Sequence, residues 1–433
     1  MNQLIVQKYG GTSVGTLERI KEVAKRIARQ RKVGVDLVVV VSAMAGETDK
    51  LLKMASTITE NPERREIDLL LSSGERISSA LLSMALHAEG CPAMALTGRQ
   101  IGMFTDNSYT RARIKQIDTA RAKKLLQENH VLVVAGFQGI NEQGDVTTLG
   151  RGGSDTSAVA LAVALGAGQC EIYTDVDGVY TTDPNLVPEA RKLDTIFYDE
   201  MLEMASLGAK VLQIRCVEFA KKYNMPLVVK SSFVEDSRGT LICKEDPNME
   251  DPVVSGIMCD KNQAKVTIKG VPDKPGIAAD VFGALADVAL SVDMIVQNVS
   301  EEGHTDISFT VTGADLNEAI QITRQVADAI GAREVSADKN IAKISIVGAG
   351  MRSHSGVAAT MFRTLSAENI NIMMISTSEI KVSCIIQQSQ SKLAVQKLHD
   401  AFNLAEAPQA AKPLSSPKKA GGSKRVTGKR RAG

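Results

Sequence analysis

The hydrophobic pattern divides the chain into two parts. From residue 1 to about 245, short apolar and β-branched runs such as 36–41, 131–137 and 226–230 alternate with segments of helical periodicity. Continuous apolar runs are typical of strands that are covered on both faces. Their alternation with helices predicts an α/β fold, a three-layer domain with a mainly parallel sheet over residues 1–245.

After a charged, proline-marked segment, a short order of elements occurs twice. Residues 264–338 predict a strand, a helix, two strands and a helix, and residues 339–405 predict the same order again. This βαββα order is that of a ferredoxin-like module, so we expect two copies of one small unit. Residues 246–263 are then a linker between the first domain and the repeated units.

The charge distribution separates the end of the chain from its body. From Ala407 onward there are eight Lys and Arg residues and no acid, which leaves 43 basic against 50 acidic residues in the rest. Residues 406–433, rich in Pro, Ser, Gly, Ala and Lys, predict a disordered basic tail. Such a tail can contact nucleic acid or acidic surfaces, but we favour a solvated extension and expect no nucleic-acid partner.

Composition excludes several classes of protein. No apolar run approaches the roughly 18–20 residues that span a bilayer, and the N-terminus lacks a signal peptide's pattern, so we expect no membrane partner. The six cysteines are scattered without a Cys-x-x-Cys pair, as are the five histidines. We therefore expect reduced thiols, a cytoplasmic protein and no metal site built from its own side chains.

The stretch 147–157 carries the strongest chemical signal. Its core, Gly150-Arg151-Gly152-Gly153-Ser154-Asp155, lies between an apolar strand and the helix-prone run 158–165. Glycines let backbone N–H groups approach a ligand closely, and a helix N-terminus favours phosphate or carboxylate oxygens. The alternative is an ordinary tight turn capped by Ser154 or Asp155.

A second stretch of this kind opens the chain. Lys8-Tyr9-Gly10-Gly11-Thr12-Ser13 follows a short strand pattern and precedes an amphipathic helix. Lys8 supplies a mobile cation suited to phosphate. Neither stretch is a Walker A loop or a Gly-x-Gly-x-x-Gly fingerprint, so together they predict a polyphosphate site of another design.

Three further segments are candidates for the same site. The hydroxyl-rich loop 42–49 follows a buried strand, at the edge where open α/β sheets bind ligands. Glu75, in Ser72-Ser73-Gly74-Glu75-Arg76, is placed by the pattern at a helix start, where it either caps the helix or receives an ammonium group. The acidic segment 174–184 either cradles a nucleotide or is a plain turn.

In combination these motifs resemble the aspartokinases of the amino acid kinase family over residues 1 to about 405. The repeated units resemble ACT domains, at 264–338 and 339–405, with a βαββαβ fold. The resemblance implies transfer of the γ-phosphoryl of ATP to the side chain of L-aspartate. The product, 4-phospho-L-aspartate, leads to lysine, threonine and methionine. A carboxylate nucleophile is already ionised at neutral pH, so the reaction needs no histidine base.

The resemblance also assigns roles to residues. It implies that Lys8 and Asp155 are catalytic, and that aspartate is held by Thr48, Glu75, Arg151, Gly152, Gly153 and Ser154. It implies ATP contacts from Lys8, Tyr9, Gly10, Gly11, Thr174, Asp175, Tyr180, Asp183, Lys210 and Val211, with Mg²⁺ held mainly by the nucleotide phosphates. It places the effectors lysine and/or threonine at Asp273, Ala278 and Gln297 in the first unit, and at Asn371, Ile372, Ser378 and Glu379 in the second.

Assembly and two rival functions stay open at this point. The ACT repeat implies a homo-oligomer, and a shorter regulatory chain starting at Met249 or Met258 is a further option. The first rival is a kinase for glutamate, acetylglutamate or a nucleotide, which the Glu75/Arg151 pair and the ACT repeat disfavour. The second is a non-catalytic amino-acid sensor, which would have no use for Lys8, Arg151 and Asp155.

Overall fold

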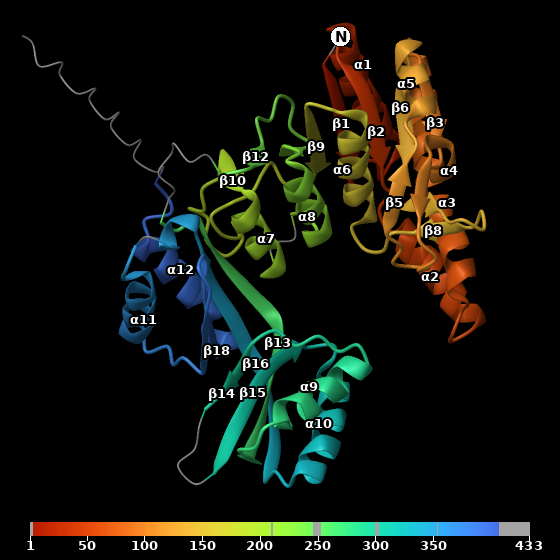
Figure 1. Ribbon diagram of the computed structural model, residues 1–433. Coiled ribbons are helices and arrows are strands. Elements are labelled where there is room, and N and C mark those ends of the chain that lie inside the picture. The colour runs from red at the N-terminus through yellow and green to blue at the C-terminus, as the bar shows by residue number, and fades with distance from the viewer. Residues whose placement is uncertain (1–2, 209–210, 246–252, 299–302, 353, 407–433) are drawn as a thin grey trace, which may run out of the picture.

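The computed structural model of the protein describes residues 3–208, 211–245, 253–298, 303–352 and 354–406. The predicted basic tail therefore lies outside the described residues, except for its first position. Figure 1 shows the α/β domain and, beside it, a second body built around a long antiparallel sheet. No helix in the described ranges is long and apolar enough to cross a membrane.

The first domain is built on an eight-stranded sheet in which only one neighbouring pair, β11 and β12, is antiparallel. The strands, in sheet order, are β10 (Thr195–Phe197), β12 (Thr240–Cys243), β11 (Leu227–Ser231), β9 (Gln169–Thr174), β1 (Leu4–Tyr9), β2 (Asp36–Val41), β6 (Val131–Ala135) and β3 (Ala93–Leu96). This confirms the predicted mainly parallel sheet.

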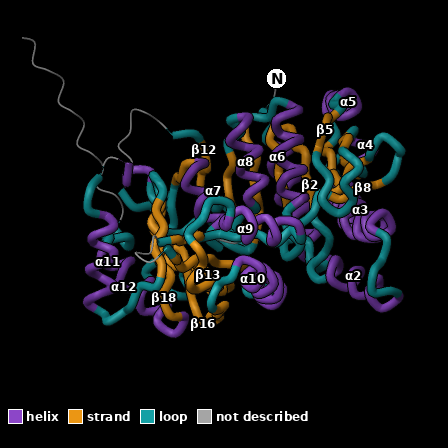
Figure 2. Tube along the Cα trace, turned by 60° about the horizontal axis from the view of Figure 1, so that its bottom comes forward, coloured by secondary structure: helices purple, strands orange, loops and turns teal. Residues whose placement is uncertain are grey.

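Helices cover both faces of this sheet (Figure 2). Alternate residues of β2 show why: Leu37 and Val39 pack into the core beneath one set of helices, whereas Val38 and Val40 pack into the core on the other side. The first face is covered by α1 (Leu17–Lys32) and α3 (Arg64–Ala88), and the second by α5 (Ala120–Gln127), α6 (Gly153–Leu165), α7 (Tyr198–Ser206) and α8 (Ile214–Tyr223). The three-layer prediction is correct.

A small second sheet lies beside the site described below. It consists of β5 (Ile114–Ile117), β4 (Met103–Thr105), β7 (Gln138–Ile140) and β8 (Val146–Thr148), accompanied by α2 (Glu47–Ile58) and α4 (Gly98–Ile101). The strand that directly precedes the glycine-rich turn is therefore β8, not the buried run 131–137. A hairpin separates that run from the turn.

The two predicted ACT units share one six-stranded antiparallel sheet. Its strands, in order, are β14 (Ile295–Gln297), β15 (His304–Thr312), β13 (Gly256–Pro272), β16 (Glu334–Val347), β18 (Lys381–Gln387) and β17 (Met374–Thr377). The helices α9 (Ile277–Asp287) and α10 (Leu316–Ile330) enclose one core, and α11 (Val357–Ala367) and α12 (Ser391–Ala401) enclose another.

The two long central strands exchange their ends between the units, which corrects the predicted boundaries. Residues 256–260 of β13 pair with residues 343–347 of β16 and complete the second unit, although they lie within the predicted 246–263 linker. Residues 334–338 of β16 complete the first unit, so the predicted boundary after residue 338 falls inside a strand. The first unit is therefore nested in the second, and each has the full βαββαβ complement.

Candidate active site

A cavity of about 340 Å³ lies where the glycine-rich stretches of the sequence meet. Lys8 reaches it from β1, residues 42–46 from the loop after β2, and Phe137 from the segment after β6. Its walls are Lys8, Gly11, Ser42, Ala43, Met44, Ala45, Gly46, Thr48, Glu75, Phe137, Arg151, Gly152, Gly153, Ser154 and Asp155. All six residues predicted to hold the amino-acid substrate line this one cavity.

The two residues predicted to be catalytic form an ion pair in the cavity wall. The Lys8 ammonium lies 2.6 Å from Asp155 Oδ1, and both side chains are about nine-tenths buried. Lys8 is near the end of β1, and Asp155 is in the first turn of α6, where a carboxylate complements the helix dipole. The pair joins the two glycine-rich stretches and holds a cation at the cavity.

The turn that carries Arg151 requires glycine on both sides. Gly150 and Gly152 have φ values of 78° and 72°, in the left-handed region that side chains rarely adopt. Helix α6 begins at Gly153, earlier than the helix-prone run 158–165, and its N-cap is Gly152 rather than Ser154 or Asp155. Arg151 is exposed and lines the cavity, and it forms no ion pair with any residue that the structure describes. Its charge is therefore available to a substrate carboxylate.

Two charged side chains that the sequence did not predict hold this turn in place, the buried Asp68 and the half-buried Arg215. Asp68 accepts hydrogen bonds from the backbone N–H and hydroxyl of Thr148 (2.8 and 2.6 Å) and from the N–H of Thr110 (2.9 Å). Arg215 donates to the carbonyl oxygens of Leu149 and Ala112, each at 2.8 Å. Both side chains thus fix the residues immediately before Arg151. No glycine or hydroxyl motif marks either position in the sequence.

Glu75 lies in the middle of the 25-residue helix α3, which corrects its expected place at a helix start. Gly74 belongs to the segment that was expected to open a helix, but glycine is needed inside the helix because a Cβ there would lie 2.7 Å from Ala43 Cβ. The close approach brings Glu75 to the loop after β2, where its Oε1 accepts the N–H of Ala43 at 3.1 Å.

The Glu75 carboxylate is poised between its two protonation states. Its Oε2 is buried and has no hydrogen-bond partner among the described residues. Burial raises the pKa of Glu75 to about 7, and the hydrogen bond from Ala43 opposes that rise only in part. A substrate ammonium group beside it would restore the ionised form. The position of Glu75 in the middle of α3 removes the helix-cap alternative, and the ammonium role stays a prediction.

Phe137 contributes a strained backbone to the cavity wall. Its φ is 67°, which is unusual for an aromatic residue and typical of functional sites. The conformation is held by the Ser157 hydroxyl, which accepts the Phe137 N–H at 3.1 Å, and by Leu149, whose N–H donates to the Phe137 carbonyl at 2.8 Å. Phe137 was not among the predicted site residues.

The first glycine pair has two different roles. A Cβ on Gly11 would lie 2.9 Å from the Ala43 carbonyl oxygen, so this position admits only glycine without a shift of the loop. The Gly10 N–H is engaged by the Tyr173 carbonyl at 3.1 Å and continues the pairing of β1 with β9. Helix α1 begins only at Leu17, capped by Thr16, so this stretch is separated from the helix by a turn.

Tyr9 is placed differently from the other predicted nucleotide contacts. Successive side chains of a strand point to opposite faces, so Lys8 faces α6 and Tyr9 faces α1. The Tyr9 ring is fully buried and stacks on Tyr173, with 4.7 Å between ring centroids. Its side chain therefore does not reach the cavity, and its carbonyl accepts the N–H of Ser42 at 3.1 Å.

The other predicted nucleotide contacts lie outside the cavity. Thr174 is the last residue of β9, and exposed Asp175 follows it. The Tyr180 hydroxyl donates to Asp177 at 2.7 Å. Asp183 accepts the N–H of Asn185 in a turn, and half-buried Val211 packs on the main core. Lys210 lies outside the described residues.

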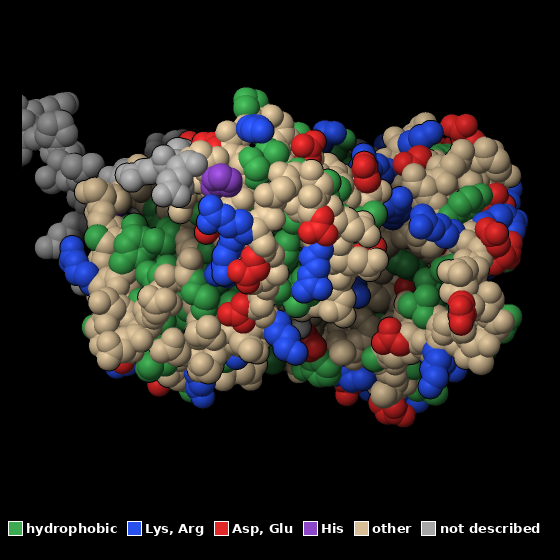
Figure 3. Space-filling view, turned by 90° about the horizontal axis from the view of Figure 1, so that it is seen from below, with side chains coloured by type: hydrophobic (Ala, Val, Ile, Leu, Met, Phe, Trp, Pro, Cys, Tyr) green, Lys and Arg blue, Asp and Glu red, His purple; other side chains and the backbone are tan. Residues whose placement is uncertain are grey.

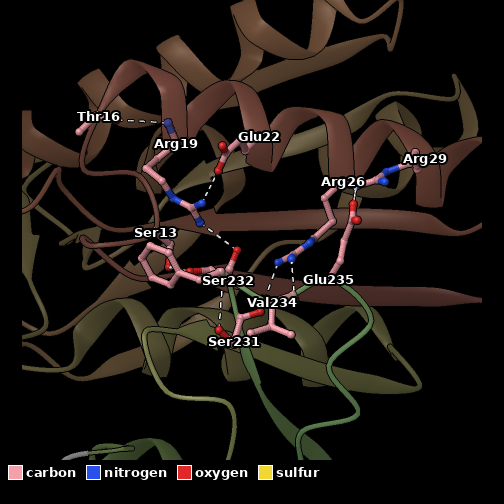
Figure 4. A network of polar contacts seen from close by, with 11 residues as sticks. Ser13, Thr16, Arg19, Glu22, Arg26, Arg29, Ser231, Ser232, Val234 and Glu235 are labelled. Carbon is pink, nitrogen blue, oxygen red and sulfur yellow. Dashed lines mark hydrogen bonds and ion pairs between the residues drawn. The ribbon is translucent and has the colours of Figure 1, made fainter.

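A network on the far side of β1 ties the ends of three strands together (Figure 4). Arg19 and Arg26 of α1 donate to the carbonyl oxygens of Ser232 and Val234, in the loop after β11. Ser232 in turn accepts the Ser13 hydroxyl at 2.8 Å, and its N–H donates to the Thr174 carbonyl at 2.9 Å. The first glycine stretch and the segment after β9 are thus held to one loop.

The predicted effector residues fall in two separate places. Asp273, Ala278 and Gln297 are exposed and lie in the turn after β13, at the start of α9 and at the end of β14. The second set precedes or follows β17: Asn371, Ile372, Ser378 and Glu379. Since β14 and β17 are opposite edges of the shared sheet, one chain does not bring the two sets together.

Charged side chains do not suggest a nucleic-acid surface on the face seen in Figure 3. Lys and Arg side chains there are interspersed with Asp and Glu, and no continuous basic area covers that view. A nucleic-acid site requires a cluster of positive charge along one face. The absence of a nucleic-acid partner stays a prediction.

Comparison with known proteins agrees with the geometry. Residues 3–231 match the model of the amino acid kinase family, and residues 266–325 and 344–402 match an ACT domain. The chain is 56% identical to an aspartate kinase of Stutzerimonas stutzeri, over 93% of this chain and 97% of that protein.

Solved structures extend the similarity to the whole architecture. The crystal structure of Escherichia coli aspartokinase III with aspartate and ADP (R-state) has a TM-score of 0.73 at 28% identity, over 92% of this chain and 99% of that one. The same enzyme with lysine and aspartate (T-state) gives a TM-score of 0.72 at 29% identity, over 93% and 100%. The chain belongs to the amino acid kinase family, as one of its aspartate kinases.

Proposed function

We propose that the cavity binds L-aspartate and that the chain transfers to it the γ-phosphoryl group of ATP. The observation that carries this is the pairing, in one cavity of amino-acid size, of a buried carboxylate lacking a partner with an available guanidinium. Glu75 would accept the substrate ammonium, and Arg151 would hold a carboxylate. Thr48, at the start of α2, and Ser154 would complete the contacts.

The transfer itself needs positioning and charge neutralisation rather than a base. A side-chain carboxylate oxygen of aspartate forms the new bond to the γ-phosphorus, while the bond from that phosphorus to the β,γ-bridging oxygen breaks and ADP leaves. Charge develops on the transferring oxygens, and Lys8, held by Asp155, is the nearby cation. The product is 4-phospho-L-aspartate, and no proton has to be removed from the nucleophile.

Mg²⁺ fits this arrangement as a companion of the nucleotide. Among the described residues, no three His, Cys, Asp or Glu side chains gather into a metal site. We therefore propose that the ion is held mainly by the phosphate oxygens, where it neutralises their charge. The protein's own contribution would be Lys8, the backbone near Gly11 and the dipole of α6.

The ACT units would carry feedback regulation and assembly. The E. coli neighbour was solved with lysine in its T-state, so lysine is the first effector to test and threonine the second. The edge strands β14 and β17 expose Ile295 and Ile375, about half of each side chain, and unpaired edges favour pairing with a second chain. We propose a homo-oligomer formed through this sheet, in the cytoplasm.

An assay of acyl phosphate formation tests the proposal. Purified protein is incubated with ATP, Mg²⁺ and aspartate, and the product is trapped with hydroxylamine as the hydroxamate. Glutamate, N-acetylglutamate and nucleoside monophosphates serve as competing acceptors, and Lys8→Ala serves as the inactive control. Turnover with aspartate alone supports the assignment, whereas a preference for another acceptor would overturn it.

A further inference from the structure

The last helix of the second ACT unit makes a buried hydrogen bond to the loop assigned to the nucleotide. The Thr181 hydroxyl lies 3.0 Å from His399 Nε2, across 218 residues of sequence. Neither residue is exposed to solvent. Thr181 follows Tyr180 directly, and His399 lies in α12, so the bond joins the kinase domain to the regulatory unit.

The direction of this hydrogen bond follows from the other contacts of Thr181. Its hydroxyl oxygen accepts the Arg191 N–H at 3.0 Å, which leaves the hydroxyl hydrogen free to be donated to His399. Burial lowers the pKa of His399, which favours the neutral ring with an acceptor nitrogen. His399 Nδ1 is buried and has no hydrogen-bond partner within the described part of the chain.

The Thr181 backbone is fixed from two further sides. Its N–H donates to the Arg191 carbonyl at 2.9 Å, and its carbonyl accepts the N–H of Ile257 in β13 at 2.7 Å. Ile257 belongs to the strand end that completes the second unit. Thr181 is therefore held by a returning segment of its own domain and by two elements of the second ACT unit, the strand β13 and the helix α12.

The segment after Thr181 continues into the regulatory unit. Val187 is 2% exposed and belongs to the core enclosed by α11 and α12. Gln396 of α12 donates to the Leu186 carbonyl at 3.2 Å, and Arg191 donates to the Glu406 carbonyl at 3.0 Å. The chain thus leaves the nucleotide loop, packs against α12, and returns to the kinase domain at Lys192, which pairs with Asp177 of that loop.

From these contacts we propose that His399 is a positioning residue for nucleotide binding, acting through Thr181. The loop 174–180 is short, and its end is fixed by the bond from Thr181 to α12. A shift of α12 in the regulatory unit would then displace Tyr180 and change the affinity for ATP without touching the aspartate cavity. The inference rests on the assignment of residues 174–183 to the nucleotide, which is part of the proposed function.

Matched substitutions separate the hydrogen bond from packing. Thr181→Val removes the hydroxyl at nearly constant volume, and Thr181→Ser keeps it. His399→Leu and His399→Asn remove the group at the Nε2 position, whereas His399→Gln places a polar atom close to it. We expect Thr181→Val and His399→Leu each to raise the KM for ATP about three- to tenfold, the range for one buried hydrogen bond. The KM for aspartate should change less than twofold.

The double variant Thr181→Val/His399→Leu should be no worse than either single variant, because both remove the same bond. Thr181→Ser and His399→Gln should each have a KM for ATP close to that of the wild type. Parallel increases in both KM values, or additive effects in the double variant, would show that the contact is merely structural and overturn the inference. If His399→Leu fails to fold, the smaller and polar His399→Asn provides the same comparison.

Calorimetric titration with ADP distinguishes this inference from the proposed function, because binding requires no phosphoryl transfer. Loss of ADP affinity in Thr181→Val, in a protein that does not phosphorylate aspartate, would refute the function and support the positioning role. Unchanged ADP affinity in Thr181→Val, in a protein that phosphorylates aspartate, would support the function and refute the positioning role.

Discussion

Lys8 Nζ and Asp155 Oδ1 are 2.6 Å apart. Lys8 is near the end of the first strand, whereas Asp155 is in a helix that begins some 145 residues later. The pair fixes the cation beside the cavity before any ligand binds. Preorganised charge of this kind stabilises a transition state without the cost of reorganising it. The contact joins the end of a sheet strand to the helix that follows the glycine-rich turn, and the proposed phosphoryl transfer depends on it.

Removing the Lys8 charge should depress kcat with little effect on the KM for aspartate. We expect Lys8→Ala to lower kcat about a hundred- to thousandfold, the range for loss of one preorganised electrostatic contact. Steady-state kinetics with both substrates provide the measurement. The variant also leaves Asp155 unpaired, so the double variant Lys8→Ala/Asp155→Asn is the control. The double variant should be more stable to thermal unfolding than Lys8→Ala and as inactive as Lys8→Ala. A near-normal kcat in either variant would show that Lys8 has no role in the mechanism.

Glu75 should make aspartate binding depend on pH. Its pKa is raised to about 7 by burial, and only the ionised form attracts the substrate ammonium. The KM for aspartate should therefore rise as pH falls through about 7 and level off above it, while the KM for ATP stays nearly constant. In Glu75→Gln the KM for aspartate should be high at every pH and lack this step. A step that persists in Glu75→Gln would assign the titration to another group.

Asp68 should affect aspartate binding although it does not line the cavity, because it holds the turn before Arg151. In Asp68→Asn an amide replaces a carboxylate that accepts from Thr110 and Thr148, so a donor meets donors and the turn before Arg151 loosens. We expect a loss of about 1–3 kcal/mol in the free energy of unfolding and a higher KM for aspartate. Denaturant titration and kinetics measure the two effects.

Thr148→Val is the matched control for Asp68, because it removes only the side-chain bond of 2.6 Å. Its effects should have the same sign as those of Asp68→Asn and be smaller. If Asp68→Asn unfolds more easily but keeps the wild-type KM for aspartate, Asp68 contributes to the stability of the fold and not to aspartate binding.

The sequence predicts those residues of the site whose role depends on the local backbone conformation. Gly150, Gly152 and Gly11 are visible because only glycine fits the left-handed or closely packed positions that they occupy. Asp68 and Arg215 escape notice because a single charge on a helix is usually solvated, and only the fold turns these two toward buried loops. The segment around Gly74 was expected to begin a helix, but this glycine lies inside α3 and permits a close contact between the helix and the loop after β2.

The nesting of the ACT units cannot be predicted from the local pattern of apolar and polar residues. Residues 256–260 were predicted to lie in a linker, but they continue into the strand of the first unit, and a register shift near Asp260 lets them pair in the second unit. Pairing partners more than 80 residues apart leave no periodic signal in either segment. The order of helices and strands is therefore predictable, whereas the exchange of strand ends depends on tertiary packing.

The last prediction concerns the two effector sets, which lie at opposite edges of one sheet. Near β17, Arg352 contacts Glu379 at 3.7 Å, so the second set already includes a charged pair beside the turn at Gly350. Near β14, Gln297 is exposed at a strand end. A ligand inhibits only by binding one arrangement of the enzyme better than another. We therefore expect Gln297→Ala or Ser378→Ala to relieve inhibition by lysine or threonine while leaving uninhibited turnover nearly unchanged.

Dose–response curves for each amino acid, alone and together, measure which edge binds which effector. Because the two edges are separated within one chain, the two substitutions should act on different effectors or on different subunit contacts, and sedimentation with and without effector distinguishes these outcomes. Loss of basal activity without loss of inhibition, in either variant, would contradict the division of the molecule into a catalytic domain and a separate amino-acid receptor.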